Sequence, residues 1–520
     1  MSERLDKVKL VKDANGHWER RDSLDNIGIS TFVLIKDAIL EGRNQLAKDL
    51  VDYLFIPEVK LLNNSDSDWL WGWSSFALNN YGEDSVTEAW NRTLAISARG
   101  RGGRRGGPMG APPEASAEDR LIKGYALMTW KDHRMGKYDG RDGFTVREYE
   151  DRLELVWDPC SSGGRMMRGD NIVNTPSRMG QPYNLAVTQV PHDWSWNKAG
   201  ICLYCCHCAI LHGQMDVDRT GYVGWTIDPP TAENPKKACI WTAYKNSDDA
   251  PEEYYKSLGR NKPPRKTPYV KPKNPNKLIR TIHSDEYGGY PYNNVKKAID
   301  AGDKEEALKQ LEVISQRTGQ HVMGLTRWVW AWADYIVEKY GYNELYHAWR
   351  TVDYARVPRR AVGTPKPTKE TIPVAEERIR KAALWWRSGR SGPSAEGSVN
   401  IIEEPDRFVL EMHPCGLGGW NRLTNPLNGL TSAIEPPASM GVTTEPVDIA
   451  WGKTGVPHYC TRCCVQEEVR AIADTGYLTT VVEWDRNPHW CHWYFYKDLY
   501  KIPETFYTRI GAKKPAPQSK

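Results

Sequence analysis

The chain contains the same series of motifs twice, and this repetition constrains its fold more than any other feature. Four pairs of segments match in the same order: "WLWGWSSFALNNYGEDSVTEAW" (69–90) with "WVWAWADYIVEKYGYNELYHAW" (328–349), "RLELVWDPCSSGG" (152–164) with "RFVLEMHPCGLGG" (407–419), "YCCHC" (204–208) with "YCTRC" (459–463), and "CIWTAYKN" (239–246) with "CHWYFYKD" (491–498). The offset between copies changes by only a few residues. We therefore predict a first repeat unit at 1–258, a linker at 259–283 and a second unit at 284–520.

Each unit is expected to begin with helices and to end with strands. Residues 34–55 and 294–316 have helical apolar spacing, and each Trp-rich segment after them predicts a second helix, which Gly82 or Gly341 ends before a further helical turn. Strand-like runs follow: "RLELVW", "GYVGWTI" and "ACIWTAY", then "RFVLEM", "GYLTTVVEW" and "CHWYFYK". The predicted fold class is α+β, with two tandem homologous units, each an N-terminal helical part and a small, mainly antiparallel sheet. The two units would form an intramolecular pseudo-dimer. The sequence leaves open whether the chain also forms homo-oligomers.

Two segments of biased composition interrupt this pattern. Residues 99–119 are rich in Gly, Arg and Pro and are predicted to be an insertion in the first unit only, and residues 259–277 form the Pro/Lys-rich start of the linker. An RGG tract can bind RNA, but one short copy is more typical of a loop. The net charge of +4 also argues against nucleic acid as the partner.

The sequence predicts a cytoplasmic protein. No apolar run follows the charged N-terminal residues, and no run long enough to cross a membrane occurs, so we expect neither a signal peptide nor a membrane span. Eleven cysteines without an export signal favour reduced thiols.

Comparing the two copies selects the cysteines that belong to the shared scaffold. Cys160, Cys205 and Cys208 match Cys415, Cys460 and Cys463, whereas Cys202, Cys206 and Cys464 have no counterpart. A C-x-x-C pair plus a third thiolate is typical of a zinc site. His212 and Glu467 stand four residues after the motifs, so the predicted ligand sets are Cys160, Cys205, Cys208 and His212, and Cys415, Cys460, Cys463 and Glu467. His192, His207 and Cys239 are rival fourth ligands in the first unit.

Other readings of the cysteines remain open. Residues 202, 205 and 208 have the spacing of an iron–sulfur ligand set, although the second copy carries Pro457 at the first of these positions. A C-x-x-C pair can also be a redox centre, and a buried free cysteine can be a core residue, which is the expectation for Cys239 and Cys491. The Glu that zinc deaminases carry in their first motif is missing after Cys160 and Cys415.

The first copy is richer in groups that bind anions or move protons. Arg165, His192 and His207 occupy positions where the second copy has Trp420, Val447 and Arg462. We therefore expect the active site in the first unit, with His192 or His207 moving protons and Arg165 binding an anionic group. The second unit would be a degenerate structural partner.

The unit resembles a group of uncharacterised bacterial proteins with "DPCGSGGR"-like and "YCxHC"-like motifs. The matching segments are "WDPCSSGGRM", "WSWNKAGICLYCCHC" and "AWGKTGVPHYCTRC". More loosely, the plan of helices followed by a cysteine-bearing α+β part is similar to the L-2-amino-thiazoline-4-carboxylic acid hydrolase and 4-vinyl-reductase-like group. This resemblance implies a small-molecule site near the cysteines and hydrolysis of a C–N or C–S bond.

The sequence therefore predicts a zinc-dependent enzyme, a hydrolase of a small aromatic or heterocyclic substrate held between Trp-rich helices. A non-catalytic, duplicated zinc-binding interaction protein is the first alternative. A thiol-redox or iron–sulfur protein, with iron in place of zinc, is the second.

Overall fold

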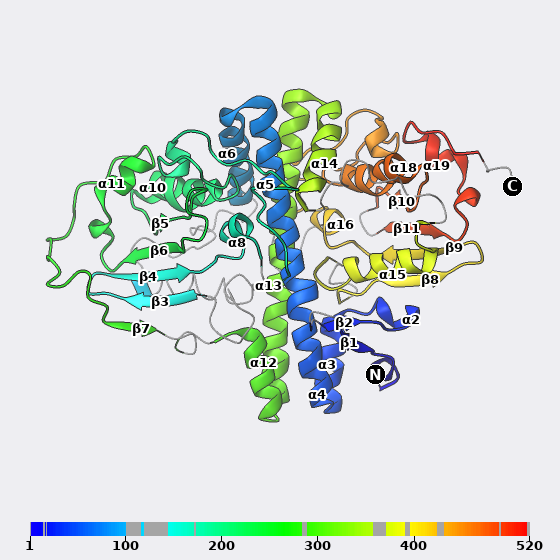
Figure 1. Cartoon of the computed structure of the whole chain (residues 1–520), viewed down its shortest axis with the longest axis horizontal. Helices are drawn as coiled ribbons and strands as arrows, with labels where there is room; N and C mark the ends of the chain where they lie inside the picture. The colour runs from blue at the N-terminus through cyan, green and yellow to red at the C-terminus, as the bar shows by residue number, and fades with distance from the viewer. Residues whose placement is uncertain are drawn as a thin grey trace.

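The computed structural model arranges the chain as a central column of helices with one lobe on each side (Figure 1). The left lobe in that view contains strands β3 to β7, and the right lobe contains β8 to β11. The described residues are 2–13, 16, 18–99, 116–118, 144–170, 173–282, 286, 289–356, 371–390, 396–423, 431–487 and 490–516. The RGG tract predicted as an insertion lies outside them.

Two helical stretches, one from each half of the chain, form the column. The first consists of α3 (Thr31–Glu41), α4 (Asn44–Tyr53), the π-helix η1 (Leu54–Lys60), α5 (Leu61–Tyr81) and α6 (Glu83–Arg99). The second consists of α12 (Pro291–Asp300), α13 (Lys304–Tyr340) and α14 (Tyr342–Arg356). Gly82 and Gly341 end α5 and α13 with φ of 85° and 87°, a left-handed conformation that glycine adopts at low cost. These two helix ends confirm the sequence prediction.

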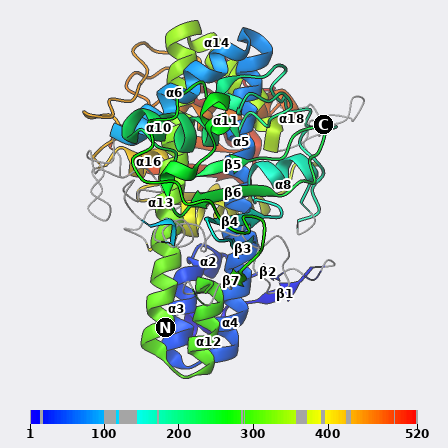
Figure 2. The same ribbon diagram turned by 90° about the vertical axis from the view of Figure 1, so that its left-hand side faces the viewer.

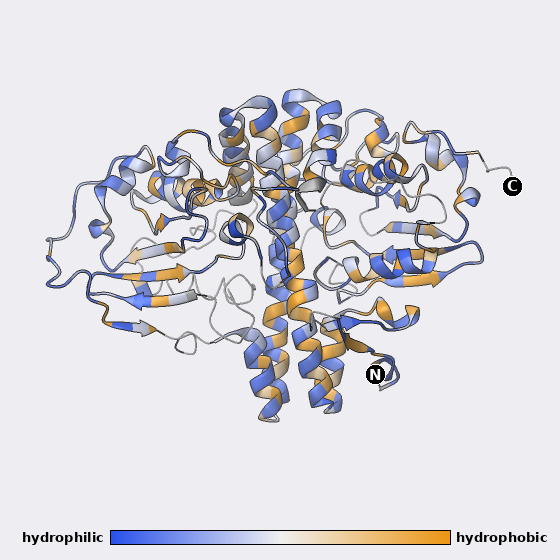
Figure 3. Ribbon diagram, viewed as in Figure 1, coloured by the Kyte–Doolittle hydropathy of each residue, from blue (hydrophilic) through white to orange (hydrophobic). Residues whose placement is uncertain are grey.

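In the second stretch, one helix boundary differs from the sequence prediction. The helix expected over 294–316 is broken after Asp300, and α13 then continues through the Trp-rich segment as one helix of 37 residues. Asp303 caps α13 by accepting a hydrogen bond from the Glu306 amide at 3.0 Å. The lower part of α13 joins α3, α4 and α12 in a bundle that projects below the lobes (Figure 2). Hydrophilic and hydrophobic residues alternate around these helices (Figure 3), as expected where each buries one face.

Helices from the two halves pack against each other crosswise. Helix α14 packs on α5, and α6 packs on α13. The contacts are reciprocal between the two sequence copies. Trp73 packs on Trp349 at 4.8 Å between ring centroids, and their counterparts Trp332 and Trp90 pack on each other at 5.4 Å. Tyr81 stacks on its own counterpart, Tyr340, at 3.6 Å. All four tryptophans are fully buried. Aromatic pairs of this size make a large apolar contribution to the interface.

Each lobe contains one antiparallel sheet. The five-stranded sheet has the order β5-β6-β4-β3-β7 and the four-stranded sheet the order β10-β11-β9-β8. The strands are β3 (Phe144–Glu148), β4 (Arg152–Trp157), β5 (Thr226–Asp228), β6 (Cys239–Tyr244), β7 (Arg280–Ile282), β8 (Asn400–Glu403), β9 (Arg407–Met412), β10 (Val481–Trp484) and β11 (Cys491–Tyr496). The predicted α+β class, with helices followed by small antiparallel sheets, is confirmed.

Short helices complete the lobes around the cysteine motifs. They include α8 (Gly163–Arg168), α9 (Cys206–Ala209), the π-helix η4 (Ile210–Gln214) and α10 (Met215–Thr220) on the left, and α15 (Ala375–Trp386), α16 (Gly418–Asn421), α17 (Thr461–Cys463), the π-helix η11 (Cys464–Val469) and α18 (Arg470–Thr475) on the right. Helix α15 covers β9 and β11, with Trp386 against Trp493 at 5.0 Å. The remaining short helices are α1 (Ser2–Asp6), α2 (Leu24–Ile27), α11 (Glu252–Ser257) and α19 (Glu504–Thr508).

Contacts cross the boundaries drawn from the sequence. Strand β7, at the end of the predicted linker, pairs with β3 in the first sheet. The N-terminal hairpin, β1 (Leu10–Lys12) with β2 (Trp18–Arg20), lies near the right lobe (Figure 1). The π-helix η1 contacts the second half through a buried ion pair between Glu58 and Arg387 at 2.8 Å. Buried residues from both halves belong to one continuous hydrophobic core.

No helix among the described residues is long and apolar enough to cross a membrane.

Candidate functional site

The loop after the second strand of each sheet presents one cysteine to the start of a short helix. Strand β4 ends at Trp157, and Cys160 follows just before α8; the Gly164 amide donates a hydrogen bond to the Cys160 Sγ atom at 3.1 Å. In the second half, the Gly419 amide donates to Cys415 Sγ at the same distance. This hydrogen bond fixes each sulfur at the start of its short helix.

The C-x-x-C motif packs against a glycine at the start of the same short helix. A Cβ atom on Gly163 would lie 2.0 Å from Cys205 Sγ, and one on Gly418 would lie 2.4 Å from Cys460 Sγ. No side chain larger than hydrogen fits at that distance. The "SSGG" and "GLGG" turns therefore let the C-x-x-C sulfur approach the backbone beside the first cysteine.

A fourth cysteine in each half lies with the three that the sequence comparison selected. Cys239 pairs with Trp157 in the first sheet, and Cys491 pairs with Met412 in the second. Burial raises the pKa of Cys239, and the neighbouring Cys160, Cys205 and Cys208 raise it further. In the second half, Cys415, Cys460, Cys463 and Cys491 line one cavity of about 20 Å³. The structure thus brings Cys239 and Cys491 to the cysteine clusters, beyond the core role expected for them.

The two residues predicted as fourth ligands, His212 and Glu467, contact other parts of the protein instead of completing the cysteine clusters. The His212 ring packs against Trp241 at 5.0 Å, and burial lowers its pKa to about 3. Glu467 is half-buried and lines a separate groove. Both follow the C-x-x-C motif on a π-helix, whose longer turn rotates position i+4 away from position i.

The cysteine sulfurs are gathered but are not at metal–ligand spacing. Among the described residues, only Glu411, His413 and His492 bring three ligand atoms within 4.8 Å of one another. Hydrogen bonding to Cys202, together with burial, raises the pKa of Cys205. Burial also raises the pKa values of Cys239, Cys460, Cys463 and Cys491. These cysteines are therefore neutral thiols, and a metal would have to displace their protons on binding.

His207 contacts the C-x-x-C motif of the first half directly. Its Nδ1 lies 2.5 Å from the Tyr204 carbonyl oxygen, which can only accept a hydrogen bond, so Nδ1 carries the proton. The other nitrogen, Nε2, is then an acceptor and lies 3.4 Å from the Cys208 Sγ atom. The rings of Trp90 and Trp328, at 5.5 and 5.2 Å, enclose the imidazole. This places a thiol, a base and a group that orients the base in one line.

The second half has an arginine at the same position. Arg462 Nη2 lies 3.6 Å from Cys463 Sγ, and its guanidinium packs over Trp69 at 4.8 Å. Burial raises the pKa of Cys463 to about 11, and the Arg462 charge opposes that rise. The two halves therefore present different partners, a neutral base and a fixed cation, to equivalent thiols.

A second guanidinium borders the cavity in the second half. Arg422 lines the cavity, and its Nη1 donates to the carbonyl oxygens of Asp485 and Arg486 at 3.1 and 3.0 Å. Both Arg422 and Arg462 are buried, and neither has a carboxylate oxygen within 4.0 Å among the described residues. In the first half, Met167 takes the place of Arg422.

The other predicted catalytic residues have protein partners of their own. His192 Nε2 lies 2.5 Å from Glu83 Oε2, and its ring stacks on Trp194. Arg165 is buried and donates to Asp68 at 3.0 Å and to the Ser161 carbonyl oxygen at 2.6 Å. Asp68 also accepts from Arg178. Arg165 thus belongs to a buried ion-pair cluster that joins α5 to the loop after Cys160.

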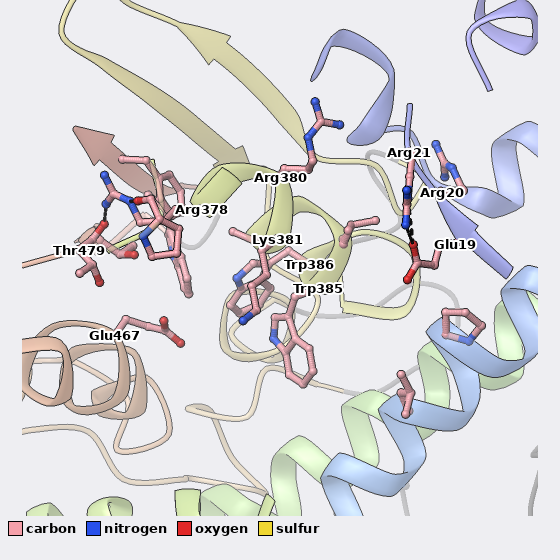
Figure 4. A pocket seen from close by; sticks show the side chains of 18 of the residues that line it. Glu19, Arg20, Arg21, Arg378, Arg380, Lys381, Trp385, Trp386, Glu467 and Thr479 are labelled. Carbon is pink, nitrogen blue, oxygen red and sulfur yellow. Dashed lines mark hydrogen bonds and ion pairs between the residues drawn. The ribbon is translucent and has the colours of Figure 1, made fainter. Parts of the chain in front are cut away.

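A large groove, which the sequence did not reveal, borders the right lobe. Its volume is about 1490 Å³, and it lies between the N-terminal hairpin, α15 and η11. In the view of Figure 4, Trp385 and Trp386 lie between Glu467 and the arginines of the hairpin. Trp386 also lines the cysteine cavity, so one indole forms a wall of both spaces.

No family model, no curated protein and no solved structure matches this chain. The chemistry of the sites themselves therefore carries the functional conclusion.

Proposed function

We propose that the chain consists of two copies of one α+β unit and that each copy binds a zinc ion through its cysteines. The shared strand order of the two sheets and the reciprocal tryptophan contacts between the halves support the duplication. The observation that carries the metal assignment is the cavity lined by four cysteines. A volume of about 20 Å³ accommodates a single ion or water molecule.

Charge balance supports a metal at that cavity. Arg422 and Arg462 are two buried cations beside four cysteines, and neutral thiols cannot compensate them. Zinc bound by four thiolates carries two negative charges, which these two guanidinium groups would neutralise. With all four positions filled by protein, the second site would be structural, as expected for the degenerate copy.

The first half has the same cysteines without these cations. Met167 and His207 replace Arg422 and Arg462, so four thiolates around a zinc ion would leave buried negative charge uncompensated. Three thiolates and an open fourth position suit this half better. Zinc with an open position supplies Lewis-acid activation of water for hydrolysis. His207 Nε2 would accept the proton, because the Tyr204 carbonyl oxygen holds Nδ1 protonated.

We propose that the enzyme hydrolyses a C–N or C–S bond in a small aromatic or heterocyclic substrate. Trp90 and Trp328 enclose His207 with flat apolar surfaces of the kind that hold such rings. The resemblance to the thiazoline-carboxylate hydrolase group supports the same class of bond. The predicted contribution of Arg165 would then be indirect, because its guanidinium is engaged by Asp68.

Metal content tests the proposal. We expect the purified chain to hold about two zinc ions by elemental analysis. Cys205→Ser should remove the ion of the first half together with the hydrolysis of thiazoline and cyclic-amide substrates, whereas Cys463→Ser should remove only the other ion. Cys206→Ala and Cys464→Ala, in cysteines without counterparts, should keep both. A chain that holds no metal and retains its activity would exclude zinc catalysis.

The contact between Cys208 and His207 also favours a second candidate, a thiol-dependent hydrolase. In that case the protein would keep its activity after a chelator has removed the metal. Alkylation of Cys208 would abolish that activity. If both ions are held by four protein ligands and no substrate is turned over, the chain is the non-catalytic zinc protein.

A further inference from the structure

Three ligand-type side chains converge at the end of two strands in the second sheet. Glu411 on β9 and His492 on β11 are directly opposed in the antiparallel register. His413 follows the last residue of β9. Because side chains alternate between the faces of a strand, His492 projects from the face opposite to Cys491 and its cavity. The cluster is therefore separate from the cysteines.

The three side chains are arranged around a common point. The Nε2 atoms of His413 and His492 each lie 3.4 Å from a different oxygen of the Glu411 carboxylate, Oε2 and Oε1 respectively. All three ligand atoms fall within 4.8 Å of one another. A hydrogen bond of this type normally measures about 2.7–3.2 Å, so these separations are long for direct bonds. They match the distance between neighbouring ligands around an ion with bonds of about 2.1 Å.

The surroundings leave one side of the cluster open. The side chains of Glu411, His413 and His492 are 20–31% exposed, enough for water to reach the ion from outside. Trp490 packs on both imidazoles, at 4.6 and 5.5 Å, and is itself 42% exposed. This ring restricts the two histidines in an orientation in which both Nε2 atoms face Glu411.

A further carboxylate lies beside the cluster. Glu483 on β10 is directly opposite His492, and it accepts a hydrogen bond from the Tyr494 hydroxyl at 2.5 Å. Directly opposed residues have their Cβ atoms about 4.5–5.5 Å apart. Glu483 therefore adds negative charge next to the point where a cation would sit.

We propose that Glu411, His413 and His492 bind a divalent first-row transition-metal ion, with open positions for water or an exogenous ligand. Two imidazoles and one carboxylate are a ligand set that such ions favour over magnesium or calcium. Val156, Asp158 and Ile240 take these positions in the first half. The site thus belongs to the second half alone and does not depend on the proposed cysteine sites.

Cobalt binding to the full chain tests this proposal. We expect Co²⁺ to give a d–d absorption spectrum with a component that disappears in His413→Asn and in His492→Asn. The difference spectrum between wild type and either variant should lack the thiolate-to-cobalt charge-transfer band. His347→Asn, in an exposed histidine on α14, is the matched control and should retain the full spectrum.

The cysteine sites are distinguished in the same titration. Cys463→Ser should lower the charge-transfer band and leave the histidine-dependent component unchanged. Circular dichroism of each histidine variant checks that it is folded, and Glu411→Gln provides a second route because it keeps the size of the side chain. If these three variants bind as much cobalt as wild type, the cluster is only a carboxylate between two imidazoles and the proposal fails.

Discussion

A single position distinguishes the chemistry of the two cysteine clusters. His207 and Arg462 occupy equivalent places next to a C-x-x-C sulfur, yet one can accept a proton and the other cannot. We expect Cys208 to be alkylated by iodoacetamide more slowly in His207→Asn than in wild type near neutral pH, because the thiol loses its proton acceptor. Peptide mass spectrometry after chelation measures the rate at each cysteine.

The control for this comparison is Cys463, whose rate should not change in His207→Asn because Arg462 is its neighbour. Equal rates at Cys208 in wild type and variant would show that His207 does not act as its base.

A buried histidine makes stability depend on pH. Burial lowers the pKa of His212 to about 3, whereas in the unfolded chain it is about 6.5. Between these values the unfolded chain binds a proton that the folded chain does not, so the free energy of unfolding falls as the pH decreases. From about pH 7 to about pH 4.5 this group alone costs about 2–3 kcal/mol. His212→Gln should show a smaller fall in its urea midpoint over that range.

His347→Gln is the matched control for the pH experiment, because His347 is exposed and should leave the fall unchanged. Parallel falls in all three proteins would mean that His212 already takes up its proton in the folded state.

At the level of residues, the sequence identified three of the four cysteines in each cluster. Comparison of the copies retained Cys160, Cys205 and Cys208 and matched Cys239 with Cys491. It left Cys239 as either a rival fourth ligand or a core residue, because strand register sets its contact with the cluster. The same comparison shows His413 and His492 in place of Asp158 and Ile240, which is the signal that could have revealed the further metal cluster. The pairing of Arg165 with Asp68 depends on tertiary packing that no local pattern records.

Among the elements, the short helices α8 and α16 set how closely each C-x-x-C motif approaches the first cysteine. Gly163→Ala and Gly418→Ala would each place a methyl group on a sulfur atom. We expect each variant to destabilise the fold by about 1–3 kcal/mol and to weaken zinc retention in its own half only. Denaturant midpoints and elemental analysis measure the two effects.

Gly180→Ala is the matched control, since a Cβ atom there meets no other atom within 4 Å. If the Gly163 and Gly418 variants behave like this control, the approach of the sulfur is not required for metal binding.

Sequence patterns predicted the elements well where one periodicity dominates. Strands β4 and β9 coincide with "RLELVW" and "RFVLEM", because their apolar residues face a buried layer. The π-helices η4 and η11 could not be predicted, since an inserted residue leaves no local composition signal. Strand β7 was read as linker because its residues are largely exposed and it pairs at a sheet edge with β3.

For the whole molecule, the interface between the halves buries several of the chain's tryptophans. Trp73, Trp90, Trp332 and Trp349 are buried where helices of one half meet helices of the other. His207 packs on Trp328 of the second half, and Arg462 packs on Trp69 of the first. Each cysteine cluster is therefore completed by an indole from the opposite half. One half alone would expose these indoles and lose a wall of its own site.

This arrangement predicts that the halves stay associated without a covalent link. The linker near Val270 is exposed, and a recognition sequence for a specific protease inserted between Val270 and Lys271 would allow cleavage there. We expect the cleaved chain to elute from a size-exclusion column as one species at the position of the intact protein, with its zinc content unchanged. In urea the two fragments should separate. A second cleavable protein carrying Trp332→Ala, which removes an indole from the interface at an expected cost of about 3–5 kcal/mol, should separate at lower urea. Fragments that part immediately after cleavage, without denaturant, would show that the crosswise helix contacts do not hold the halves together.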